Sequence, residues 1–139
     1  MAQKEVQLKR KIGDKTEDVL VRVCYCAATE IGYERISGNS IEVFSPKHEK
    51  DENGNVVVKP ASATLEDYIQ LALSAIISAY ISKGEEAPVK SEDLMYACTS
   101  KQITNLIREV VALRNEWYLI PELATQGEEE KKDEKPEKN

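Results

Sequence analysis

Reactive and metal-binding side chains are scarce in this sequence. It has one histidine, His48, and three cysteines, of which Cys24 and Cys26 are neighbours while Cys98 lies far along the chain. A zinc site needs about four ligands, and a secreted disulfide scaffold has a denser, even set of cysteines. The cysteines are therefore predicted to be small buried thiols. No metal and no other cofactor is expected.

The sequence motifs of common enzyme classes are missing too. There is no glycine-rich phosphate loop, no G-x-S-x-G elbow, and no cysteine with an obvious histidine partner. Residues 51–55 resemble the start of a calcium loop, but the glycine and the final glutamate that such a loop requires are out of place. The carboxylates fall on faces predicted to be exposed, so no acid–base pair can be named. Neither enzymatic activity nor a catalytic residue is expected.

Long hydrophobic runs and an excess of positive charge are also lacking. The apolar run 71–81 contains serines and is shorter than the ~20 residues that a bilayer requires. Residues 1–13 contain no apolar signal-peptide core, which predicts a cytoplasmic protein. The formal net charge of −6 disfavours general binding to nucleic acids or anionic membranes, and neither is expected as a partner. The length of 139 residues suits one domain, predicted over residues 1–123.

The most apolar segment, 64–83, is predicted to be a central helix. Apolar residues at helical spacing form a wide stripe along it. Three more residues extend this stripe almost around the helix: Leu71, Ala75 and Ala79. Thr64 can cap the N-terminus, with Asp67 at the reciprocal position, and Gly84 ends the helix. We expect a helix this apolar to be covered on most sides and to form the core.

Alternating apolar and polar residues predict a β-hairpin over residues 5–23, with a turn signal at Gly13–Lys15. Its expected inner-face residues are Val6, Leu8, Ile12, Val19, Val21 and Val23. A second hairpin with a long polar loop is expected between the apolar runs 41–44 and 56–58. The pair Asn53-Gly54 in that loop is a strong signal for a tight turn.

Three further helices are predicted over residues 24–37, 91–98 and 100–119. The expected buried stripe of the first consists of Cys24, Ala27, Ala28 and Ile31. Gly32 in that helix suggests a kink or a close contact with another helix. Ser91 and Thr99 are the predicted caps of the other two, and the last helix is expected to pack antiparallel to the central one. Residues 124–139 are predicted to form a disordered charged tail.

Two candidate binding surfaces follow from these elements. The first is a run of apolar residues that ends the last helix and either completes the core or receives a protein partner: Trp117, Tyr118, Leu119 and Ile120. The second requires helices 91–98 and 100–119 to form a helix-turn-helix that reads DNA. Its DNA-facing residues would be Lys101, Gln102, Asn105 and Arg108. The acidic composition, with Glu109 and Glu116 on the same helix, argues against this second surface.

Five segments follow one another in a distinctive order. They are the hairpin VQLKRKIGDKTEDVLVRV, the segment CYCAATEIGYERISGNSI, the apolar helix LEDYIQLALSAIISAYI, the short helix SEDLMYACT and the long helix ITNLIREVVALRNEW, followed by a charged tail. This order resembles the tail assembly chaperones of long-tailed bacteriophages and prophages. The resemblance covers Val6 to about Leu123 and is a pattern of elements rather than a signature motif.

The resemblance implies an α+β fold that is mainly α-helical, with an N-terminal β-hairpin followed by a small helical domain. It also implies a non-enzymatic protein of the bacterial host cytoplasm that binds the tape-measure protein. Such a chaperone keeps the apolar helices of its partner from aggregating and helps to recruit tail-tube protein. The alternatives are a prophage-encoded helix-turn-helix regulator and a structural component of the phage tail.

Overall fold

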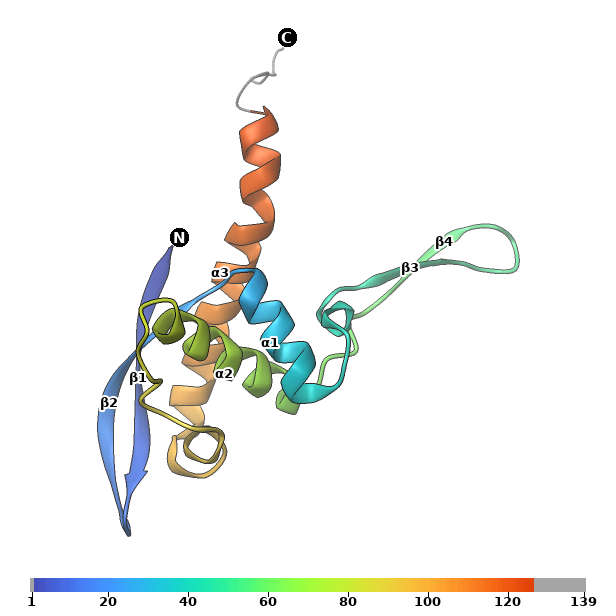
Figure 1. Cartoon of the computed structure of the whole chain (residues 1–139). Coiled ribbons are helices and arrows are strands. Elements are labelled where there is room, and N and C mark those ends of the chain that lie inside the picture. Colours follow the sequence, from blue (N-terminus) through green and yellow to red (C-terminus); the bar gives the residue numbers. More distant parts are fainter. Residues whose placement is uncertain (1, 127–139) are drawn as a thin grey trace.

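The computed structural model describes residues 2–126, in which a long β-hairpin packs against three α-helices (Figure 1). The elements are β1 (Gln3–Ile12), β2 (Lys15–Cys24), α1 (Ala27–Ser37), the 3₁₀ helix η1 (Ile41–Phe44), β3 (Lys47–Lys50), β4 (Val56–Lys59), α2 (Leu65–Ile81), the π-helical turn η2 (Asp93–Ala97) and α3 (Ser100–Gln126). Helices account for 50% of the residues and strands for 24%, which confirms the predicted α+β class. Most of the predicted tail, 127–139, lies outside the described residues.

Hairpin β1–β2 forms where the sequence alternates, and one of its faces enters the core. The strands pair antiparallel with Val6 opposite Val21 and Leu8 opposite Val19. Val6, Leu8 and Val21 are buried, as their period of two predicted. Ile12 was expected on the same inner face but is exposed, because the end of the hairpin extends beyond the helices (Figure 1).

Helix α2 lies at the centre of the core, as predicted. Thr64 and Asp67 cap it reciprocally: Asp67 N–H donates to Thr64 Oγ1 over 3.2 Å, and Thr64 N–H donates to Asp67 Oδ2 over 2.8 Å. Buried residues occupy most sides of this helix. Its exposed apolar residues are Leu65, Ile77 and Ile81.

Helix α1 begins later than predicted, at Ala27, and faces the core with different residues. Its buried residues are Thr29 and Tyr33, whereas Ala27, Ala28 and Ile31 of the predicted stripe are exposed. The rotation has a polar cause. Tyr33 donates a 2.7 Å hydrogen bond to Asp67, and Thr29 bonds to Ser78, so both side chains turn toward α2.

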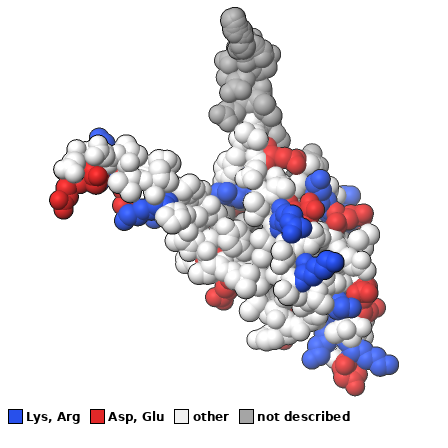
Figure 2. Space-filling model, turned by 180° about the vertical axis from the view of Figure 1, so that it is seen from behind, with Lys and Arg blue, Asp and Glu red and all other residues white. Residues whose placement is uncertain are grey.

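The predicted strand at 41–44 is wrong, because these residues form the 3₁₀ helix η1. Ser40 caps it by accepting a hydrogen bond from Glu42 N–H, and Phe44 packs edge-on against Tyr33 and Tyr68. The valine strand β4 is confirmed, but its partner is the polar segment β3 rather than 41–44. Together β3 and β4 extend away from the helices (Figures 1 and 2).

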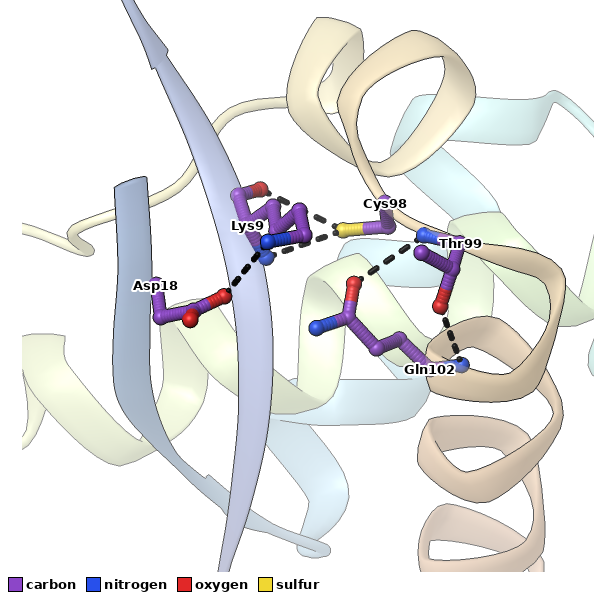
Figure 3. Close-up of polar contacts among 5 residues, drawn as sticks. All are labelled: Lys9, Asp18, Cys98, Thr99 and Gln102. Atoms are coloured by element: carbon purple, nitrogen blue, oxygen red, sulfur yellow. Dashed lines mark hydrogen bonds and ion pairs between the residues drawn. The ribbon is translucent and has the colours of Figure 1, made fainter. Parts of the chain in front are cut away.

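The predicted helix 91–98 is present over residues 91–97, most of which form the π-helical turn η2, and Ser91 does not cap it. Asp93 fixes this turn instead, since its two carboxylate oxygens accept hydrogen bonds from Lys90 N–H and Lys11 N–H, each 2.8 Å long. Cys98 follows the turn, and its Sγ contacts both Lys9 N and Lys9 O (Figure 3). The turn and Cys98 therefore cover the edge of β1.

Helix α3 starts with the predicted capping box, in which Thr99 and Gln102 exchange hydrogen bonds (Figure 3). Its buried residues Leu106, Val110 and Leu113 follow the expected helical spacing. Two expectations fail. The helix continues beyond residue 119 to Gln126, and it crosses α2 rather than lying antiparallel beside it (Figure 1).

Candidate partner-binding surface

Helices α1 and α2 pack very closely because small residues line their contact. A Cβ atom added to Gly32 would lie 2.3 Å from Ser74 Oγ, which confirms the predicted close contact at this glycine. Ser74 Oγ donates a 2.7 Å hydrogen bond to Thr29 O, and Thr29 Oγ1 lies 3.0 Å from Ser78 Oγ. Each of these buried hydroxyl groups therefore has a hydrogen-bond partner within the seam.

An apolar groove runs along the outer side of this seam. We call it the α1–α2 groove, and its lining residues are Ala28, Ile31, Gly32, Arg35, Ile36, Ser74, Ile77, Ser78 and Ile81. The four isoleucines are exposed, from 37% for Ile77 to 65% for Ile81. The groove has a volume of about 450 Å³. Its four exposed isoleucines make this groove the candidate protein-binding surface.

The predicted patch at the end of α3 is divided between the core and the surface. Trp117 is partly buried and packs against the core, with its ring 5.7 Å from that of Tyr25. Tyr118 and Leu119 are each about half exposed. The side chain of Ile120 lies outside the described residues. Because consecutive helical residues point about 100° apart, Trp117, Tyr118 and Leu119 do not share one face, and the role of the predicted patch in binding stays a prediction.

Tyr118 is held in place by polar contacts from two other elements. Its hydroxyl bonds to Glu30 of α1, which also accepts a 2.7 Å hydrogen bond from Tyr25. The guanidinium of Arg114 lies 4.8 Å from the centre of the Tyr118 ring. Burial and the hydrogen bond to Glu30 raise the pKa of Tyr118. The ring is therefore pre-positioned at the junction of α1 and α3, with its exposed side available to a partner.

Among residues 2–126 no set of histidine, cysteine and carboxylate side chains is arranged to hold a metal ion. Burial raises the pKa of the Cys24 thiol to about 11, so it is protonated at neutral pH. The thiol of Cys26, at the N-terminus of α1, is partly exposed. Burial opposes its ionisation, but hydrogen bonds with Thr29 and Ala28 outweigh burial and lower its pKa. His48 lies on β3, away from these thiols in the fold (Figure 1).

The polar residues predicted to face DNA do lie together. Lys101, Gln102, Asn105 and Arg108 line one shallow hollow with Gln7 of β1. A helix-turn-helix also needs a regular α-helix before α3, and residues 91–97 supply only a short helical segment that is mostly the π-helical turn η2. On the face seen in Figure 2, basic and acidic side chains are interspersed rather than separated. A duplex would thus meet mixed charge on this face.

Comparison with known proteins adds no relative: no family model, no curated protein and no solved structure matches this chain. Within the described part of the chain, every helix is too short or too polar to cross a bilayer.

Sequence reasoning missed the α1–α2 groove because it assigned Ile31 and the isoleucines of the central helix to apolar stripes that face the core. A signal was present in α2, which is apolar on more sides than its neighbours can cover. The side left open could not be identified from α2 alone. It depends on the rotation of α1, which the polar contacts of Thr29 and Tyr33 decide.

Proposed function

We propose that this chain is a non-enzymatic assembly chaperone of a bacteriophage tail. In this role it binds the tape-measure protein in the host cytoplasm, keeps that protein soluble and helps to bring tail-tube protein to it. The proposal rests on the resemblance in the order of elements and on the apolar surface of the folded domain.

The observation that carries the proposal is the α1–α2 groove. A tape-measure protein is a long helix whose apolar stripes have no partner until the tail tube forms, so the free chain is prone to aggregate. An apolar groove between two helices suits the apolar face of a third helix, which would place side chains at i, i+3, i+4 and i+7 in it. The isoleucines Ile31, Ile77 and Ile81 are the candidate contacts of such a helix.

The surroundings of the groove suit a soluble complex. The chain has a net charge of −6, which favours solubility. Arg35 lines the groove among apolar residues, so an acidic residue beside the apolar stripe of the partner would find a cation there. Tyr118 and Leu119 provide a second exposed surface, at the junction of α3 with α1.

Co-expression with the tape-measure protein of the same phage tests the proposal. The wild-type chain is expected to raise the soluble yield of that protein and to co-purify with it. Ile31→Ser and Ile81→Ser should each reduce the yield, because they remove apolar area from the groove. Leu65→Ser is the matched control, since Leu65 is on α2 and is as exposed as Ile81 but does not line the groove. Circular dichroism would verify that all three variants are folded.

The second surface is tested in the same assay with Tyr118→Ala and Leu119→Ser. If these variants lose the complex while the groove variants keep it, the binding face is the end of α3. If the wild-type chain neither co-purifies with the tape-measure protein nor changes its solubility, the proposed function is wrong.

A further inference from the structure

The hairpin formed by β3 and β4, which we call the arm, is unusually exposed. It projects from the body of the molecule (Figure 1), and Val56, Val57 and Val58 are 63%, 41% and 57% exposed. Two strands alone are marginally stable in water; further strands or a packed layer are needed to hold them together. Among residues 2–126, no element covers the valines of the arm.

The two edges of the arm differ in chemistry. Asp51 N–H donates a 2.9 Å hydrogen bond to Asn55 O, and the antiparallel register then pairs Glu49 with Val57 and His48 with Val58. Because bonded and non-bonded pairs alternate, the backbone N–H and C=O groups of Val56 and Val58 point away from β3. The β3 edge consists of charged residues and a histidine, which discourage further pairing. The valine edge of β4 has no such protection.

We propose that β4 of one molecule pairs antiparallel with β4 of a second copy of this chain, so that the two arms form a four-stranded sheet. The outward backbone groups fix the register. Val56 of each copy bonds with Val58 of the other, which places the two copies of Val57 directly opposite each other on a two-fold axis. Valine then faces valine at all three positions, the type of pair that stabilises a sheet.

The charges of the arm support a second copy as the occupant. Asp51 and Glu52 lie at its tip, whereas Lys47 and Lys59 lie opposite each other at its base. Figure 2 shows acidic side chains at the far end of the arm, with a basic one beside them, and further basic side chains nearer the body. In the antiparallel register the acidic tip of each arm comes level with the basic base of the other. Lys59 also pairs with Glu49 of its own arm over 3.0 Å. With the arms turned end to end, the acidic tip of each arm lies nearer to the lysines at the base of the other than it would in a parallel arrangement.

Sedimentation velocity of the full chain over a range of concentrations tests the proposal, with a dimer as the expected species. Val58→Pro removes an outward N–H from the β4 edge and leaves the bonds between β3 and β4 intact. The dimer contains two copies of the change, so its Kd should rise roughly thirtyfold. His48→Pro is the matched control, because His48 pairs with Val58 and its N–H faces outward on the opposite edge. The control should dimerise like the wild type.

A charge reversal tests the orientation of the two arms. Glu52→Lys should raise the dimer Kd roughly threefold at low salt and have little effect at high salt. Glu86→Lys makes the same change in net charge in an exposed loop outside the arm and should leave the Kd unaltered.

The proposal is overturned by a monomeric wild-type chain or by a dimer that survives Val58→Pro. It is also overturned by equal loss of the dimer in both proline variants, or by equal effects of the two lysine variants on the Kd. None of these measurements involves the tape-measure protein, so they are independent of the proposed function.

Discussion

Hairpins β1–β2 and β3–β4 have the same antiparallel pairing but very different surroundings. One face of the first enters the core through Val6, Leu8, Val21 and Val23, whereas every residue of β3 and β4 is exposed. The first hairpin can alternate apolar and polar residues because α2 and α3 cover one of its faces. The second has valines on both faces and no covering layer within the described chain.

The edges of the two hairpins also differ in whether other parts of the chain cover their outward backbone groups. On β1, the outward backbone groups of Lys9 and Lys11 bond to Cys98 and Asp93. On β2, Arg22 N–H donates a 3.2 Å hydrogen bond to Tyr80 of α2. Side chains thus occupy positions that a further strand would otherwise take. A sheet edge is thus blocked by its tertiary neighbours, and the edge of β4, which has none among residues 2–126, is the one proposed to associate.

The largest expected effect is a contrast between aspartate substitutions in the two regions. Ile76 is fully buried in the core that supports β1–β2, so Ile76→Asp would bury an unpaired carboxylate and should unfold the domain. Val57→Asp makes a similar change in the arm, where the carboxylate stays in water. It should leave the melting temperature of the body almost unchanged. Thermal unfolding followed by circular dichroism checks both, and a folded Ile76→Asp protein would show that α2 is not central.

The second prediction concerns Asp67, which anchors the chain on both sides of the arm. Its carboxylate accepts hydrogen bonds from Tyr33, Asn39 and Thr64. Burial by itself would raise the pKa of Asp67, but the hydrogen bonds outweigh it and lower the pKa from 3.8 to about 2. The folded protein thus holds the proton less tightly than the unfolded chain.

The contribution of Asp67 to stability is therefore complete above pH 3.8 and is lost as the pH falls from there toward 2. It should amount to about 2 kcal/mol. Urea unfolding between pH 2 and pH 6 measures it, with Asp67→Asn as the comparison. The substituted protein should be less stable at pH 6 and should lose less stability on acidification. Equal slopes in the two proteins would contradict the prediction.

The third prediction removes the protection of the β1 edge. Asp93→Ala leaves Lys11 N–H and Lys90 N–H without their acceptor, which should cost about 1–2 kcal/mol of stability. Hydrogen exchange at the amide of Lys11 should become much faster, because the outward N–H of β1 would then be exposed to water, as the outward N–H groups of β4 are. Glu92→Ala, a change in the exposed neighbour, is the control and should alter neither. Unchanged exchange at Lys11 would mean that Asp93 does not protect this edge.

Much of the fold was predictable because it depends on strong local patterns. The alternation around Gly13 indicated β1–β2, and the apolar segment with its Thr64 cap indicated α2. The capping box of Thr99 and Gln102 marked the start of α3. In each case the residues that define the element are neighbours in the sequence, so their spacing alone carries the information.

The errors share another cause. Phe44 was placed in a strand, but its ring packs between Tyr33 and Tyr68, which lie in different helices. The run from Trp117 to Ile120 was treated as one patch, but Trp117 turns toward Tyr25 while Leu119 is exposed. A pattern of apolar residues shows that a segment packs against the rest of the protein. It does not show which side faces a partner that is distant in the sequence.

The sequence by itself determined that this chain forms a hairpin followed by a mainly helical core, because periodicity, caps and turn residues act over only a few positions. Tertiary structure alone decided which apolar residues stay outside. Hydrogen bonds from Thr29 and Tyr33 to α2, formed across 49 and 34 positions of the chain, rotate α1 and leave Ile31 in an open groove. The same holds for the edges, since Cys98 covers Lys9 from 89 positions away while β4 lies beyond the reach of any such neighbour in the described structure.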